Sequence, residues 1–291
     1  MTLPNFEYIK AQSIEEASKL AAVFGGKCNV IAGGTDVIPL LKDRVIAPEY
    51  IIDLKGIPGM EQLEFVPGQG LKVGALTKLN TIEKSALVKK EMPAVADAAH
   101  YVASKQIRCK GTMAGNICNA SPSADTAPIL LAMNATVKTF SATDGKREIP
   151  ITDFFKGVKK TALKPGELVT EINIPELKSG EGSAYLKHAV RKAMDVAIIG
   201  VASWVKMDGK KIADCRIAVG GAATTPFRAT DAEQMLIGQE FSDYLLEEAA
   251  VVVAGACKAI SDVRASAEYR TDMVRVFTKR SFKKALETLK A

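Results

Sequence analysis

The sequence has only two histidines and five cysteines among 291 residues, and neither residue type is clustered. The cysteines, at positions 28, 109, 118, 215 and 257, are odd in number, widely separated and never spaced as C-x-x-C. This scatter argues against structural zinc and against a cysteine-ligated iron–sulfur cluster. We therefore expect no metal site in this chain, and we expect a reduced, cytoplasmic protein.

The chain also lacks the roughly 18 consecutive apolar residues of a membrane span, and its N-terminus has neither the basic flank nor the apolar core of a signal peptide. No run of lysine and arginine is dense enough for nucleic acid, so the net charge of +6 favours an anionic cofactor or an acidic partner. Low-complexity tracts are absent. A length of 291 residues with 47% hydrophobic residues predicts two or three globular domains.

The pattern of helices and strands divides the chain into three predicted domains, at residues 1–57, 58–176 and 177–291. Strand and helix signals alternate in the first, which predicts a small α/β lobe whose sheet has parallel character. The second mixes helices with short strands broken by proline and glycine turns. In the third, strands joined at a hairpin turn by Asp208-Gly209 precede helices, which predicts a three-stranded antiparallel sheet covered by helices.

A glycine turn, Gly33-Gly34-Thr35-Asp36, is the first candidate ligand site. It follows a short buried strand and leads into a helical pattern, so its backbone N–H groups and the positive helix end form a good cradle for phosphate. The glycines could instead serve only a tight strand-to-helix turn with unusual backbone angles. The sequence leaves both interpretations open.

A second stretch of small residues runs from Thr112 to Asp125. Small side chains let the main chain approach a ligand, and Thr112, Asn116, Ser121 and Asp125 supply donors and acceptors. Because Pro122 precedes a helical pattern, Ser121 could instead cap the helix, with Asp125 as a first-turn acid that suits the helix dipole. Two such turns in separate domains predict one extended ligand with a diphosphate gripped between them.

Both stretches resemble the FAD loops of one family. A-G-G-T-D-V-I-P-L-L-K (32–42) and G-T-M-A-G-N-I-C-N-A-S-P-S-A-D-T-A-P (111–128) are similar to the two loops in the medium subunit of molybdenum hydroxylases, a group that includes carbon monoxide dehydrogenase, nicotinate dehydrogenase and split bacterial xanthine dehydrogenases. Residues 185–202 and 218–229 resemble the start of that family's C-terminal domain. The resemblance covers essentially the whole chain. It implies an α+β fold, with a two-lobed FAD-binding domain of the p-cresol methylhydroxylase and vanillyl-alcohol oxidase type followed by an antiparallel sheet and a helix bundle.

The resemblance implies FAD as the cofactor, with the diphosphate across both glycine turns and the isoalloxazine ring toward the C-terminal domain. Ser121 and Asp125 would bond the ribityl chain or the ring edge, and Val169 would contact the ring. Lys187 would lie near the ring and raise its potential, although a strand lysine can also be simply solvated. The implied FAD-binding residues are Val30, Ile31, Ala32, Gly33, Gly34, Thr35, Asp36, Val102, Thr112, Ala114, Gly115, Asn116, Ser121, Asp125, Val169 and Lys187.

The resemblance also implies electron transfer, with no catalytic acid, base or nucleophile from this chain. Similar complexes hydroxylate a substrate at a molybdenum-pterin centre in a large subunit and pass single electrons through the [2Fe-2S] clusters of a small subunit to FAD. FAD can release electrons as a pair, so the chain would reduce a soluble acceptor, with NAD, a quinone and ferredoxin as candidates. Hydroxybenzoyl-coenzyme-A reductases of this group carry a cysteine-rich insertion that is missing here, which disfavours that subgroup.

Two other functions stay open on the sequence. One is a self-sufficient flavin oxidoreductase of the same fold, which would need its own acid or base and has only Lys187, Arg191 and Asp195 near the motif. The other is a non-redox nucleotide-binding or scaffold protein that has kept the fold.

Overall fold

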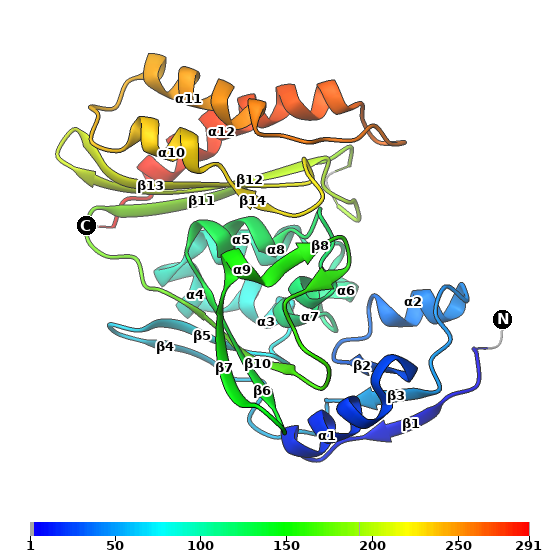
Figure 1. Cartoon of the computed structure of the whole chain (residues 1–291). Coiled ribbons are helices and arrows are strands. Elements are labelled where there is room, and N and C mark those ends of the chain that lie inside the picture. Colours follow the sequence, from blue (N-terminus) through cyan, green and yellow to red (C-terminus); the bar gives the residue numbers. More distant parts are fainter. Residues whose placement is uncertain (1–2, 192, 291) are drawn as a thin grey trace.

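The computed structural model describes residues 3–191 and 193–290 and places them in two lobes and a C-terminal domain, each with its own sheet (Figure 1). A fourth, two-stranded sheet is a small hairpin in the second lobe. This α+β arrangement agrees with the fold class that the resemblance implies. Within the described ranges, no helix is both long and apolar enough to cross a membrane.

The first lobe alternates strands with helical segments. In chain order they are β1 (Glu7–Lys10), α1 (Ile14–Phe24), η1 (Gly25–Lys27), β2 (Cys28–Ile31), α2 (Val37–Lys42) and β3 (Tyr50–Asp53). The strands pair in the order β1-β3-β2, and both pairings are parallel, as the sequence predicts. Ser13 caps α1 by accepting a hydrogen bond from the N–H of Glu16 at 3.1 Å. Parallel strands bring their carboxyl ends to one edge of the sheet, and the first glycine turn leaves from that edge.

The second lobe is built on an antiparallel sheet in the order β4-β5-β10-β6-β7. Its strands are β4 (Leu63–Val66), β5 (Gly70–Gly74), β6 (Thr136–Ser141), β7 (Gly145–Pro150) and β10 (Leu168–Ile174). Its helices are α3 (Leu79–Lys84), α4 (Ala86–Glu91), α5 (Pro93–Tyr101), α6 (Lys105–Arg108), α7 (Met113–Cys118), α8 (Thr126–Ala132) and α9 (Ile151–Phe154). The hairpin of β8 (Phe155–Gly157) and β9 (Lys160–Thr161) follows α9.

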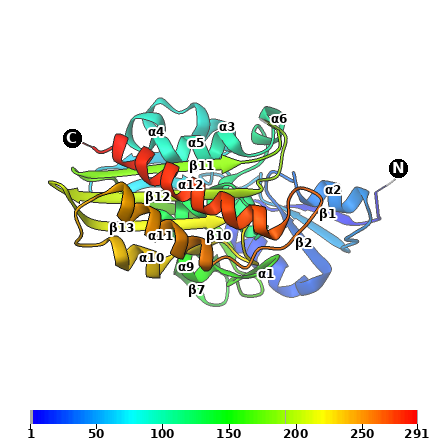
Figure 2. The same cartoon turned by 90° about the horizontal axis from the view of Figure 1, so that it is seen from above.

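The C-terminal domain has one sheet, β11-β12-β13-β14, with helices on its outer face (Figures 1 and 2). Its elements are β11 (Glu181–His188), β12 (Ile199–Asp208), β13 (Lys211–Gly220), β14 (Phe227–Arg228), α10 (Thr230–Leu236), α11 (Asp243–Gly255) and α12 (Ala267–Glu287). The sequence predicts three strands in this sheet, but the structure has four, because the two-residue strand β14 is added at its edge. That strand pairs with the end of β13 and is too short to show a period of two.

The two faces of the C-terminal sheet contribute side chains to two different cores. Along β12, Ala202 and Trp204 pack into the core of the second lobe, whereas Val201 and Val205 pack beneath the outer helices. Helix α8 lies between the two sheets, and every residue of it is buried. This explains why its sequence, TAPILLA, has no polar face.

Helix α1 fixes the first lobe to the second. The buried hydroxyl of Ser18 donates to the carbonyl oxygen of Gly166 at 2.7 Å and accepts from the N–H of Ala142 at 2.7 Å. Because this buried hydroxyl both donates and accepts a hydrogen bond, it avoids the free-energy cost of an unpaired polar group. The lobes therefore meet in one fixed orientation, with the first glycine turn facing the second lobe.

Candidate functional site

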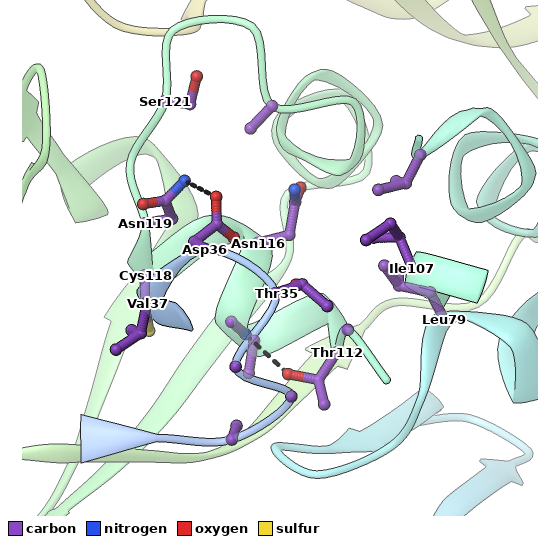
Figure 3. Close-up of a pocket in the computed structure, with 18 of the residues that line it drawn as sticks. Thr35, Asp36, Val37, Leu79, Ile107, Thr112, Asn116, Cys118, Asn119 and Ser121 are labelled. Carbon is purple, nitrogen blue, oxygen red and sulfur yellow. Dashed lines mark hydrogen bonds between the residues drawn. The ribbon is translucent and has the colours of Figure 1, made fainter. Parts of the chain in front are cut away.

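A cavity of about 610 Å³ lies between the two lobes, and both glycine-rich stretches line it (Figure 3). Its volume falls within the range of roughly 300–1,000 Å³ that is typical of small-molecule and cofactor sites. The β2–α2 turn forms one wall and the α6–α8 segment forms another. Val169 of β10 and two residues after β11, Asp195 and Val196, complete the cavity. Four parts of the chain that are far apart in sequence therefore meet here.

Gly33 brings the two walls into direct contact. A Cβ atom at this position would lie 2.2 Å from the carbonyl oxygen of Lys110 and 2.8 Å from the Cα of Gly111. Both neighbours are backbone atoms of the second lobe, so neither can rotate away. The next residue, Gly34, has φ +74°, in the left-handed region that favours glycine. The interpretation of these glycines as only a tight turn is thus incomplete, because Gly33 also permits the lobes to touch.

The first glycine turn presents unused backbone donors. Among the described residues, the N–H groups of Gly33, Gly34, Thr35 and Asp36 have no protein acceptor. All four residues line the cavity, and none is fully buried. Consecutive N–H groups in a turn form a concave site that suits an anion. The turn can therefore contact a phosphate group directly through its backbone N–H groups.

The second stretch of small residues, from Thr112 to Asp125, contains a short helix, α7, where the sequence suggested an open turn. Thr112 caps it by accepting a hydrogen bond from the N–H of Gly115 at 2.9 Å (Figure 3). Asn116 accepts from the hydroxyl of Thr126 at 2.6 Å, which ties α7 to the start of α8. The small residues Ala114 and Gly115 lie on the cavity wall. Small side chains thus keep this side of the cavity open even though the backbone is helical.

Asp125 does not cap α8, although it immediately precedes that helix. Its carboxylate instead accepts hydrogen bonds from the Tyr185 hydroxyl and the Lys187 ammonium group, each at 2.9 Å. Burial raises the pKa of Asp125, and the bonds from Lys187 and Tyr185 oppose that rise. Helix α8 begins five residues after Ser121, so the interpretation of Ser121 as a plain N-cap is also wrong.

Lys187 is buried rather than solvated, with its side chain only 5% exposed. Besides Asp125, its ammonium group donates to the carbonyl oxygens of Tyr101 at 3.0 Å and Asp195 at 2.8 Å. Lysine has three N–H donors, so all of them are used. Lys187 does not line the cavity, and it joins three segments that border it. The sequence around Lys187 could not reveal these hydrogen bonds, because the acceptors belong to three other segments of the chain.

Glu167 closes the cavity beside β10. It accepts hydrogen bonds from Arg147 at 2.7 and 2.8 Å, from Thr139 at 2.5 Å and from the N–H of Lys164 at 2.9 Å. Burial of the carboxylate opposes ionisation, but these bonds outweigh it, and the pKa of Glu167 lies below its usual value of 4.5. The group therefore stays ionised near neutral pH.

Glu167→Gln is expected to lower the free energy of unfolding by about 1–3 kcal/mol near neutral pH, because the amide leaves part of this buried network unpaired. A carboxyl with a lowered folded-state pKa stabilises the fold above its unfolded pKa and loses that contribution as the pH falls through the folded value. The difference between wild type and variant should thus shrink below about pH 4.5. Urea unfolding from pH 3 to 8 tests this, with the exposed Glu148→Gln as control; a pH-independent difference contradicts it.

The cavity also has walls that local sequence patterns did not indicate. Leu54 and Leu79 line it through tertiary packing, with no motif to mark them. Cys118 and Asn119 lie inside the recognised motif and were overlooked there. Burial raises the pKa of the Cys118 thiol to about 12, so it is a neutral wall residue. In the part of the chain that the structure describes, no group of three or more His, Cys, Asp or Glu side chains could hold a metal ion.

Comparison with known proteins decides the family. The family model described as "FAD binding domain in molybdopterin dehydrogenase" matches residues 4–177, more than half of the chain. The chain belongs to this family. A second family model, "CO dehydrogenase flavoprotein C-terminal domain", matches residues 184–285. The chain is thus an FAD-binding oxidoreductase subunit of the molybdopterin dehydrogenase family, which confirms the cofactor and the family that the four motifs predict.

Relatives of this molybdopterin dehydrogenase flavoprotein match along nearly their full length. The glyceraldehyde dehydrogenase medium chain of Sulfolobus acidocaldarius is 37% identical over 284 residues, covering 96% of this chain and 98% of that protein. The carbon monoxide dehydrogenase medium chain of Hydrogenophaga pseudoflava is 31% identical, with 98% of each chain covered. A solved structure of carbon monoxide dehydrogenase from Hydrogenophaga pseudoflava, lacking the Mo-pyranopterin moiety of its cofactor, superposes with a TM-score of 0.96 at 31% identity over 100% of both chains.

The structure brings nearly all the implied FAD-binding residues of this flavoprotein to one cavity. Ile31 and Lys187 do not line it: Ile31 is buried under the first turn, and Lys187 lies behind Asp125. The implied residues that do line the cavity are Val30, Ala32, Gly33, Gly34, Thr35, Asp36, Val102, Thr112, Ala114, Gly115, Asn116, Ser121, Asp125 and Val169.

Proposed function

We propose that this chain holds FAD between its two lobes and carries electrons from the [2Fe-2S] clusters of a small subunit to a soluble acceptor. Those electrons originate at the molybdenum-pterin centre of a large subunit, and the whole assembly is cytoplasmic. The observation that carries this proposal is the single cavity between the unused N–H groups of Gly33 to Asp36 and the wall formed by Ala114 and Gly115.

The residues present suit a dinucleotide cofactor. The N–H groups of the first glycine turn would hold the diphosphate, and Gly115 leaves room for it because no side chain projects there. Asp125 and Ser121 would bond the ribityl chain or the ring edge, and Val169 would pack on the ring. FAD, when bound, supplies redox chemistry in one- and two-electron steps. The chain itself binds the cofactor, orients it and excludes water with the apolar residues of the cavity lining.

Two observations favour an electron-transfer subunit over a self-sufficient oxidoreductase. Lys187 has no free N–H with which to act on a substrate. Arg191 and Asp195 bond to each other, through the Arg191 backbone N–H at 2.8 Å and through an ion pair at 3.7 Å. The polar groups that a substrate site would need are therefore engaged in structural contacts.

Partner subunits would cover the apolar side chains that the C-terminal domain exposes. Tyr244 and Val251 lie on α11, and Ile260 and Val263 lie in the loop before α12; their exposed fractions reach 99% at Val263. Separate exposed apolar residues are ordinary, but a group on one domain is typical of a surface that meets another protein.

Purification of the chain with its natural partners tests the proposal. We expect a yellow preparation with a flavin absorption spectrum, and co-purification of subunits that contain molybdenum and [2Fe-2S] clusters. A flavin-free protein with an intact fold would remove the proposed function and favour a scaffold. A yellow protein that turns over a substrate without any partner would favour the self-sufficient oxidoreductase. Reduction of NAD, a quinone and ferredoxin by the assembly then identifies the acceptor.

A further inference from the structure

The cavity walls carry negative charge, although the diphosphate of the expected cofactor is itself an anion. Among the described residues that line the cavity, four are carboxylates and none is lysine, arginine or histidine. These carboxylates are Asp36, Asp125, Glu167 and Asp195. An anionic ligand in such a site needs compensation from cations behind the walls, because like charges at short range repel.

Three of these carboxylates have a cation of their own. Glu167 pairs with Arg147 at 2.7 Å, Asp125 with Lys187 at 2.9 Å and Asp195 with Arg191 at 3.7 Å. Asp36 differs: across residues 3–191 and 193–290, no ion pair is formed by its carboxylate. It also ends the first glycine turn, directly beside the N–H groups that would hold the diphosphate.

Asp36 is linked to a lysine through one intervening side chain. Its Oδ1 accepts a hydrogen bond from Nδ2 of Asn119 at 2.8 Å (Figure 3). The Oδ1 of Asn119 accepts in turn from Nζ of Lys159 at 2.6 Å. Burial raises the pKa of Asp36, and the charge of Lys159 lowers it. The positive charge of Lys159 is therefore felt at the carboxylate without direct contact.

The hairpin that carries Lys159 is fixed against the cavity wall. The backbone N–H of Lys159 donates to the carbonyl oxygen of Ala120 at 3.0 Å. Both residues have positive φ, +58° and +44°, which is uncommon for residues other than glycine. Such backbone angles persist only where the surroundings impose them. The backbone thus fixes where the exposed Lys159 side chain begins, and its hydrogen bond to Asn119 places the ammonium group.

We propose that Lys159 is the cation that offsets the charge of the bound diphosphate, and that it retains FAD through the bridge Lys159–Asn119–Asp36 across the two lobes. The inference rests on the proposed function and adds a positioning residue that no motif contains. Lys159 does not line the cavity, so it acts through Asn119 and Asp36. Without its charge, the diphosphate would face an uncompensated carboxylate beside the first glycine turn.

The test is the rate at which FAD leaves the purified assembly, followed as the rise of free-flavin fluorescence after dilution at low salt. Lys159→Gln keeps an N–H donor, on a side chain one atom shorter, but removes the charge, and we expect release roughly 3- to 10-fold faster. Lys159→Arg should release FAD like wild type. Lys160→Gln is the matched control, because this exposed neighbour has no side-chain partner within the described ranges. Asn119→Ala removes the middle residue of the bridge between Lys159 and Asp36, and it should release FAD as fast as Lys159→Gln does.

Salt and a second substitution separate a charge effect from a structural one. The difference between Lys159→Gln and wild type should shrink at high salt, because screening weakens exposed charges. Asp36→Asn should remove most of the effect of Lys159→Gln. Equal release from Lys159→Gln and wild type, equal acceleration by Lys160→Gln, or failure of Lys159→Arg to restore retention would each overturn the inference. Absence of FAD from the wild-type assembly would instead defeat the proposed function itself.

Discussion

Gly33→Ala is expected to abolish FAD retention and to lower the free energy of unfolding by about 2–3 kcal/mol. The added methyl group would lie 2.2 Å from the carbonyl oxygen of Lys110, and the backbone of Lys110 and Gly111 cannot yield without moving the lobes apart. That movement would open the cavity where the first glycine turn faces the second lobe. The FAD content per chain and the urea unfolding curve measure both effects.

Gly26→Ala is the matched control in the same lobe. A Cβ atom at Gly26 would meet nothing within 4 Å, so this variant should keep its FAD and unfold like wild type. If Gly33→Ala retained full FAD content, the close approach of the two lobes at this residue would have no role in cofactor binding.

Lys187→Met is expected to lower the free energy of unfolding by about 3–5 kcal/mol near neutral pH, the cost of leaving a buried carboxylate without its cation. The carboxylate of Asp125 is 8% exposed and would keep only the hydrogen bond from Tyr185. The substitution also frees the carbonyl oxygens of Tyr101 and Asp195. Urea unfolding provides the measurement, and Lys206→Met, at an exposed position of β12, is the control.

The pH dependence of Lys187→Met distinguishes a charge effect from lost packing. Burial raises the pKa of Asp125, and Lys187 is the cation that opposes the rise among the residues the structure describes. A carboxyl with a raised folded-state pKa stabilises the fold below its unfolded pKa and loses that contribution as the pH rises through the folded value. The deficit should therefore grow from pH 4 to pH 7, above a constant part that comes from the two freed carbonyl oxygens. A deficit that does not change with pH, or one that Asp125→Asn does not relieve in the double variant, would contradict this account.

The alternation of elements in the first lobe could be predicted from the sequence because its signals are local. Ser13 marks the start of α1, and the glycine turn after β2 marks the start of α2. The two-residue strand β14 could not be predicted, because it exists only through pairing with β13. The boundaries of the three predicted domains stay a prediction.

In the candidate site, too, local sequence patterns predict some residues, whereas others depend on contacts between distant segments. The glycine turns were found because small residues in a row are a local pattern with a physical meaning. The role of Lys187 was missed because its three acceptors come from α5, from Asp125 and from the segment after β11. Asn119 was within the recognised motif, but its importance depends on Asp36 and Lys159, which are distant in sequence. Contacts of this kind follow from tertiary structure alone.

A crystal structure of the chain with FAD bound, alone or in its assembly, tests the central claim most directly. We predict that the diphosphate lies within hydrogen-bonding distance of the backbone N–H groups of Gly33, Gly34 and Thr35, opposite Ala114 and Gly115. FAD bound elsewhere, or with its diphosphate held by lysine or arginine side chains away from the first glycine turn, would contradict the account.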